Sequence, residues 1–195
     1  MHTPTLILAG ALGLAGSILS SAAVAALPEP IASDLSRHDA EIHWPASHTP
    51  DSAVVFAHNE IVIAASCDQV WLRLIDAAGW PAWYANASDV RIEGARDGLL
   101  AAQSVLRWTT FALAVESRIH EFEPNARLGW FGKAEGVDAY HTWLLRPQGG
   151  QCLVVTEEVL RGEVAQSLLG SQPGALHDAH EQWLLGLKRR SESTG

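Results

Sequence analysis

The sequence predicts an α+β domain in which a curved antiparallel β-sheet wraps around one long C-terminal helix, and three observations support this. A run of apolar and β-branched residues at 54–64 has the composition of a strand. Turn-forming residues then recur roughly every ten positions between 89 and 160, which is typical of an antiparallel sheet. An amphipathic stretch closes the chain at 173–190. A strongly bent sheet cannot bury its concave face against itself, so we expect this helix to cover it.

Length and composition limit the classes of protein that fit. A chain of 195 residues has room for one domain, and 48% hydrophobic with 18% charged residues is typical of a globular protein. The formal net charge of −9 argues against nucleic acid or an anionic membrane surface as a partner, because both require a basic footprint. Eight tryptophans suit the wall of a pocket as well as a core, since each combines a large apolar body with a single N–H donor.

The N-terminal segment predicts export. Residues 5–27 carry no charge, and the run ends in Ala23-Val24-Ala25, a small-x-small pattern that signal peptidase cleaves. We therefore expect residues 1–25 to be a signal peptide and the protein to be periplasmic or secreted. The run is also long enough to span a bilayer, so a retained membrane anchor is the alternative, and only that alternative predicts contact with a membrane.

The segment that follows predicts little regular structure. Residues 26–52 contain four prolines and no sustained hydrophobic period, which favours a linker or irregular arm. His38, His43 and His48 fall in this segment, and their loose spacing favours solvated surface residues over metal ligands. The folded domain is expected to occupy residues 53–191.

Within the domain, two short helices are expected after the first strand. Ser66 and Asp68 are both credible N-cap residues for the first of them. Gly79-Trp80-Pro81 ends that helix, and a second short helical or turn segment runs through Trp83 and Tyr84.

The remaining elements are a meander of strands and the final helix. Turn residues such as Asp97-Gly98 and Gly149-Gly150 separate predicted strands at 89–94, 102–111, 113–122, 127–134, 138–146 and 151–160. In the final helix one continuous stripe at helical spacing is formed by Leu176, His180, Trp183, Leu184 and Leu187.

Several local motifs occur in a characteristic order along residues 54–190. They are Glu60 through Trp71 (EIVIAASCDQVW), Asp76, Trp80-Pro81-x-Trp83, Leu106-Arg107-Trp108-Thr109, Leu128-Gly129-Trp130, His141-Thr142-Trp143, Thr156-Glu157-Glu158 and Trp183-Leu184-x-x-Leu187-Lys188. In this order they resemble the START-like (SRPBCC) superfamily, which includes polyketide cyclase/dehydrase-type and birch-pollen-allergen-like proteins. The resemblance implies a helix-grip fold with an internal hydrophobic cavity. Members bind lipids, hormones or polyketides, and a minority are cyclases or hydrolases, so the fold alone says little about chemistry.

The resemblance also implies a place for the two cysteines. In that fold the last strand pairs antiparallel with the first, which brings Cys152 near Cys67. A disulfide between them would suit an exported protein, and two buried free thiols are the alternative.

Polar residues on the predicted concave face are the candidates for ligand contact. His141 and Trp143 share one face of their strand, while Tyr140 shares the other face with Thr142. Glu158 lies on the same face of its strand as Cys152. His180 interrupts the apolar stripe of the final helix, so it is expected to point at the sheet, as a satisfied core residue, a ligand contact or an acid/base.

No motif predicts a metal or cofactor site. His177 and His180 are spaced to share an ion, but no further ligands lie at diagnostic spacing. We find no nucleophile elbow, no phosphate-binding glycine loop and no cysteine–histidine pairing in the sequence.

Three functions are compatible with these features. The first is binding of a small hydrophobic ligand, lipid or polyketide-like, in a pocket whose expected lining is Trp108, Phe111, Trp130, Phe131, Tyr140, His141, Trp143, Glu158, His180 and Trp183. The second is a cyclase/dehydratase-type enzyme in which a pocket His or Glu removes a proton next to a carbonyl. The third is an envelope protein whose outer surface binds a partner.

Overall fold

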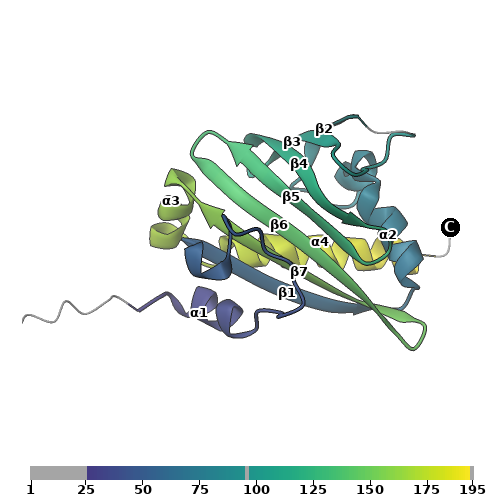
Figure 1. Ribbon diagram of the computed structural model, residues 1–195, viewed down its shortest axis with the longest axis horizontal. Coiled ribbons are helices and arrows are strands. Elements are labelled where there is room, and N and C mark those ends of the chain that lie inside the picture. The colour runs from purple at the N-terminus through teal and green to yellow at the C-terminus, as the bar shows by residue number, and fades with distance from the viewer. Residues whose placement is uncertain (1–25, 95–96, 194–195) are drawn as a thin grey trace, which may run out of the picture.

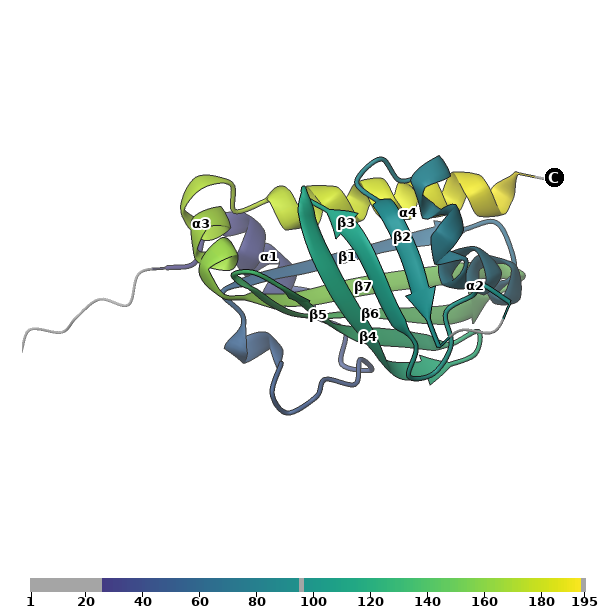
Figure 2. The ribbon, with the colours of Figure 1, turned by 90° about the horizontal axis from the view of Figure 1, so that it is seen from above.

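The computed structural model describes residues 26–94 and 97–193, and it confirms the predicted α+β helix-grip architecture (Figure 1). Its sheet has seven strands in the order β1-β7-β6-β5-β4-β3-β2, and every neighbouring pair is antiparallel. The long helix α4 (Ala175–Glu192) runs across one face of this curved sheet, as Figure 2 shows. The predicted signal peptide, residues 1–25, lies outside the described residues.

The strands and helices follow the predicted order closely. The strands are β1 (Val55–Ile63), β2 (Ser88–Glu93), β3 (Val105–Thr110), β4 (Leu113–Glu123), β5 (Arg127–Ala134), β6 (Val137–Gln148) and β7 (Gln151–Arg161). The helical elements are α1 (Glu29–Ser36), the 3-10 turn η1 (Pro50–Ser52), α2 (Cys67–Ile75), the 3-10 helix η2 (Ala77–Ala82), α3 (Glu163–Ser171) and α4. Helices α1 and α3 were not predicted. Within the described residues no helix has the length and apolarity needed to cross a bilayer.

A capping box fixes the start of α2 immediately after β1. The hydroxyl of Ser66 accepts a hydrogen bond from the backbone N–H of Gln69, and the Gln69 side chain accepts one from the backbone N–H of Ser66. Two backbone donors that the helix cannot satisfy are thereby paired. Ser66 is therefore the N-cap, and Asp68 is not.

Helix α4 is held against the concave face by one tryptophan. The Trp183 ring packs edge-on against Trp80 at 4.9 Å and against Trp143 at 5.1 Å between ring centroids, and it stacks on Tyr84 at 4.6 Å. One turn further along, the helix approaches the end of η2 so closely that a Cβ on Gly186 would lie 2.7 Å from the carbonyl oxygen of Trp83. Aromatic packing and a glycine contact thus fix the distance between α4, η2 and the sheet.

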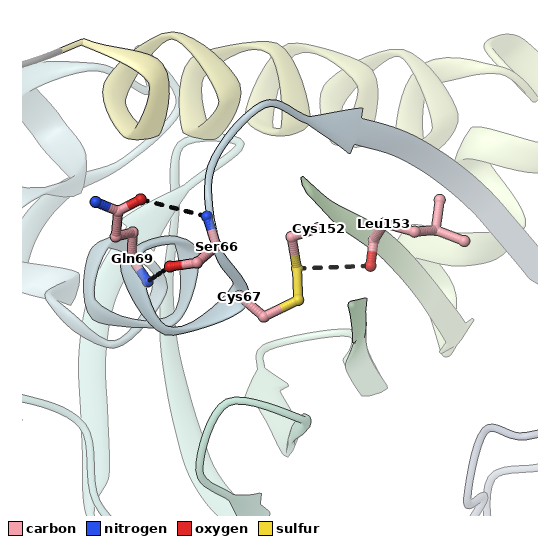
Figure 3. The surroundings of a disulfide bond; sticks show 5 residues. All are labelled: Ser66, Cys67, Gln69, Cys152 and Leu153. Carbon is pink, nitrogen blue, oxygen red and sulfur yellow. Dashed lines mark hydrogen bonds between the residues drawn. A yellow bond between two sulfur atoms is a disulfide. The ribbon is translucent and has the colours of Figure 1, made fainter. Parts of the chain in front are cut away.

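Cys67 and Cys152 form a disulfide between the start of α2 and the start of β7 (Figure 3). Cys152 pairs with Ile63 at the end of β1, which explains why the two cysteines meet. Both are almost fully buried in the large core cluster beneath α2.

The segment 26–52 is not the irregular linker that its composition predicts. It contains α1, which packs beside β1, and it then crosses the convex face of the sheet, opposite α4 (Figure 2). Its apolar side chains bury that face: Ile42 packs on Leu144 and Val155, and Trp44 contacts Tyr140. The prediction failed because these contacts join residues far apart in the chain and leave no local period.

Histidines attach this segment to the sheet, and for His38 and His48 this is contrary to the solvated role predicted for them. His38 and the β1 residue His58 both bond the carboxylate of Glu157, at 2.8 and 2.6 Å, and the backbone N–H of Asp39 donates to it at 2.7 Å. Glu157 is fully buried, so these bonds offset the cost of removing its charge from water. His43 bonds Glu121 and remains exposed.

A second ion-pair cluster anchors the end of the same segment. Buried His48 bonds Asp138 of β6 at 3.0 Å, and Lys133 and Arg161 pair with the same carboxylate. Partial burial by itself would raise the pKa of Asp138, but the hydrogen bonds from Lys133, His48 and Arg161 outweigh it and lower the pKa to about 2.

Removing the disulfide is expected to destabilise the fold strongly. The bond joins residues 85 positions apart, and on the chain-entropy model such a loop contributes about 4–5 kcal/mol. Urea unfolding of a Cys67→Ala/Cys152→Ala variant measures the loss. The same loss is expected for the wild-type protein unfolded with reductant, while the variant should not respond to reductant. A wild-type unfolding curve that reductant leaves unchanged would contradict the bond.

Candidate functional site

A cavity of about 320 Å³ lies between α4 and the concave face of the sheet. It occupies the α3 end of the molecule, where β5 and β6 contribute the small residues Gly132 and Ala139. At the opposite end, below α2, large apolar side chains fill the same space. The space stays hollow at this end because Gly132 and Ala139 contribute little side-chain volume.

Aromatic rings form much of the cavity wall. Trp108 of β3, Trp130 of β5 and Trp183 of α4 all line it, together with Tyr84 and Phe111. The indole N–H of Trp108 donates to the hydroxyl of Ser117 at 3.1 Å, which satisfies a buried donor and fixes that ring. Burial raises the pKa of Tyr84 to about 12, so its hydroxyl is neutral at physiological pH.

Three titratable side chains meet at the polar end of the cavity. His141 of β6 and Glu158 of β7 are direct cross-strand partners on the concave face. His180 descends onto them from α4: its Nε2 lies 3.0 Å from Glu158 Oε2, and its ring stacks on that of His141 at 4.5 Å. His141 Nδ1 lies 3.4 Å from the same carboxylate oxygen. We call this group the His-Glu-His cluster.

The hydrogen bonds behind His141 determine its tautomer. The Thr156 hydroxyl donates to the carbonyl oxygen of Thr142 at 3.0 Å, so it can only accept from His141 Nε2, which lies 2.7 Å away. Nε2 therefore carries the hydrogen. Burial lowers the pKa of His141 well below its ordinary value, and the nearby His180 lowers it further. The neutral ring leaves a lone pair on Nδ1, which lies 3.4 Å from Glu158 Oε2.

Most of the predicted pocket residues come together here. The structure places Trp108, Phe111, Trp130, His141, Glu158, His180 and Trp183 around the cavity. Trp143 lies behind this lining, buried between His141 and Trp183.

Tyr140 and Phe131 do not reach the cavity, and their predicted place in its wall is wrong. Side chains alternate along a strand, so Tyr140 points away from the face that carries His141. It lies on the convex side against Trp44, and its hydroxyl bonds His120 at 3.1 Å. Phe131 packs there against Tyr140 for the same reason.

Sequence reasoning missed several lining residues. Ser117 and Thr110 share the concave faces of β4 and β3 with apolar neighbours, so alternation along those strands was an available signal. Val164 and Leu168 belong to the unpredicted helix α3 and had no such signal. Gly132 lines the cavity through its missing side chain, which no motif marks.

The His-Glu-His cluster also bears on the expectation of no metal site. Its ligand atoms lie within 4.8 Å of one another, a proximity that sequence spacing did not reveal. His180 Nε2 and His141 Nδ1 both approach Glu158 Oε2, at 3.0 and 3.4 Å, and their rings are stacked with an interplanar angle of 18°. The cluster is therefore a candidate metal-binding group that was not expected from the sequence.

The chain belongs to a known family. A fold with this sheet, this helix and this cavity defines the helix-grip class, and the family model for "Polyketide cyclase / dehydrase and lipid transport" matches residues 57–192. The protein is a member of that family. No curated protein matches its sequence.

Solved structures with the same fold come from several organisms. A hypothetical protein from Helicobacter pylori is 29% identical, with a TM-score of 0.72 over 77% of this chain and 96% of that one. A Thermus thermophilus protein is 18% identical, with a TM-score of 0.59 over 70% and 96% of the two chains. Truncated norcoclaurine synthase from Thalictrum flavum is 16% identical, with a TM-score of 0.55 over 72% and 94%. At such low identity the last two show the fold alone.

Thr156→Val is expected to change the tautomer of His141. Without the hydroxyl, Nε2–H loses its buried acceptor, and the hydrogen moves to Nδ1, where Glu158 can accept it. Side-chain ¹⁵N NMR should show the Nε2-protonated form in the wild type and the Nδ1-protonated form in the variant. Thr156→Ser keeps the hydroxyl and should keep the wild-type tautomer. Identical spectra for Val and wild type would show that Thr156 does not fix the ring.

Proposed function

We propose that this protein binds a small hydrophobic ligand, lipid or polyketide-like, in the cavity under α4. The single observation that carries the proposal is an enclosed space with aromatic walls and a few polar groups gathered at one end. Such an arrangement buries the apolar body of a ligand and orients its polar part. Membership of the polyketide cyclase/dehydrase and lipid transport family supports this proposal, since lipid transport is part of the family's description.

The size of the cavity limits the ligand. A volume of about 320 Å³ lies at the small end of the range for ligand pockets. Two or three fused rings, or a short acyl chain, suit it better than a whole phospholipid. Phe111 lies at the turn between β3 and β4, partly exposed, and α3 supplies Leu168 to the same side. A ligand would enter between these two elements.

A cyclase/dehydratase-type activity is the second candidate, and the His-Glu-His cluster favours it. Neutral His141 presents a lone pair next to a carboxylate in a water-poor site, which is an arrangement able to accept a proton from a bound substrate. His180 would then hold or return a proton through Glu158. Turnover that His180→Ala abolishes while ligand binding persists would favour this candidate over binding alone.

We further propose that the protein acts outside the cytoplasm. The uncharged run at 5–27 and its small-x-small end support cleavage after Ala25, and a disulfide suits an oxidising compartment. A retained N-terminal anchor remains the alternative form of the same proposal.

Ligand binding is expected to depend on the hollow at Gly132. Isothermal titration of purified protein with 4-phenyl-1-butanol, a neutral hydrophobic probe, should show one saturable site and a rise in melting temperature. Gly132→Leu should fold and lose this binding by about tenfold or more, because its side chain projects into the cavity. A Cβ at Gly132 meets only ordinary contacts, 3.5 Å from the Cβ of Ala139, so the variant is compatible with the backbone.

The matched control is Gly170→Leu, the same substitution on an exposed position of α3 with open space around it. It should bind the probe like the wild type. Failure of the wild type to bind the neutral probe, with no ligand detected in the purified protein by native mass spectrometry, would overturn the proposed function.

Export predicts a mature protein that begins at Ala26. Mass spectrometry of the periplasmic fraction of a bacterial host expressing the full chain should give this N-terminus. Ala23→Lys/Ala25→Lys, which removes the small residues before the cleavage site, should yield only the uncut chain. Uncut wild-type protein in the membrane fraction would support the anchor, and uncut protein in the cytoplasm would contradict export.

A further inference from the structure

The polar end of the cavity presents the carboxylate of Glu158 beside the imidazole rings of His141 and His180. Among the described residues that line it, Glu158 is the only acid, and there is no Lys or Arg. His141 adds the lone pair of Nδ1, because its Nε2–H is used by Thr156. A ligand group that bonds the carboxylate and the imidazole nitrogens must itself supply donors, although the cavity wall also contains the indole N–H of Trp183, which has no partner among the described residues.

The geometry requires a donor with more than one hydrogen. His141 Nδ1 and Glu158 Oε2 face each other at 3.4 Å, and both are acceptors when the carboxylate is ionised. His180 donates to Glu158 through Nε2, which leaves its buried Nδ1 with no partner among the described residues. A group able to bond two facing acceptors simultaneously satisfies this end, whereas a single hydroxyl hydrogen satisfies only one.

Aromatic faces surround the same point. The ring of Trp130 lies 4.8 Å from that of His141, and the ring of Trp183 lies 5.3 Å from it. Cations are attracted to the faces of indole rings within about 6 Å, and most strongly where water is excluded. A carboxylate that lines the same cavity as these two tryptophans is therefore suited to an organic cation.

We infer that the ligand of this cavity is a hydrophobic primary amine, bound with its ammonium group between Glu158 and His141 and its apolar body along the tryptophan wall. The inference rests on the proposed binding function and specifies its ligand class. An ammonium group carries three N–H donors and one positive charge, which match the facing acceptors and the carboxylate. An anionic ligand would be repelled by Glu158 in a site without a compensating cation.

A metal ion is the competing cation, and the structure disfavours it. An ion bound by His180 Nε2 would displace the hydrogen bond between that nitrogen and Glu158, whereas an ammonium group leaves this bond in place. An ammonium group needs no convergent lone pairs, because each of its hydrogens bonds a different acceptor.

Three probes of equal length test the inference: 4-phenylbutylamine, 4-phenyl-1-butanol and 4-phenylbutyrate, each titrated calorimetrically into the purified protein at pH 7. The amine should bind at least about tenfold more tightly than the alcohol, and the acid should bind most weakly. In Glu158→Gln the affinity for the amine should fall about 30-fold or more, while the affinity for the alcohol should change by less than about threefold.

Glu181→Gln is the matched control. Glu181 follows His180 on α4 but does not line the cavity, so this variant makes the same chemical change outside the site. It should bind all three probes like the wild type. If the alcohol binds as tightly as the amine or more tightly, or if Glu158→Gln leaves the amine affinity unchanged, the inferred amine ligand is wrong. The proposed hydrophobic binding site is not contradicted by either result. Zinc binding that Glu158→Gln abolishes and that blocks the amine would assign the cluster to a metal instead. Absence of binding by all three probes would contradict the proposed function itself.

Discussion

Two successive carboxylates of β7 point to opposite faces of one sheet, and much of the molecule is arranged around that alternation. Glu157 faces the convex side, where His38 and His58 bond it. Glu158 faces the concave side, where His141 and His180 approach it. Carboxylates removed from water need such partners, and each one draws its histidines from distant segments. A shift of one residue in the register of β7 would exchange the two environments. Packing on both faces of the sheet therefore fixes the pairing of β7 with β1 and β6 in this register.

The two carboxylates have different roles: Glu157 holds the N-terminal segment on the convex face, and Glu158 forms part of the candidate site on the concave face. Around Glu157 the bonds are complete: two histidines and a backbone N–H occupy the carboxylate, and the N-terminal segment covers it. Around Glu158 a buried nitrogen of His180 has no partner within residues 26–94 and 97–193, and it lies next to an aromatic cavity. A satisfied network stabilises a fold, while an unsatisfied one beside a hollow is the kind of place that receives a ligand. The same residue type in adjacent positions therefore has two different roles.

Much of the fold could be predicted because it depends on local patterns. The strands alternate, the turns carry glycine and asparagine, and the stripe on α4 repeats at helical spacing. The stripe also identified His180 and Trp183 as residues that face the sheet. Segment 26–52 and α3 were missed, since their apolar residues pack only against partners distant in sequence, such as Ile42 against Val155. Tyr140 was predicted to line the pocket, although it is adjacent to His141 and side chains alternate along a strand. The alternation in the sequence was therefore sufficient to place Tyr140 on the convex face.

By itself, the sequence determined the seven strands, helices α2 and α4, the family resemblance and the aromatic character of the interior. Only the tertiary structure decided where space remains empty, because a cavity is the difference between the shape of the backbone and the volume of side chains from β5, β6, α3 and α4. It also decided which polar atoms are left without partners. His141, Glu158 and His180 come from three elements, and no spacing in the chain encodes that they meet. Hydrogen-bond satisfaction is a property of the folded surroundings, which is why the character of the site emerges only there.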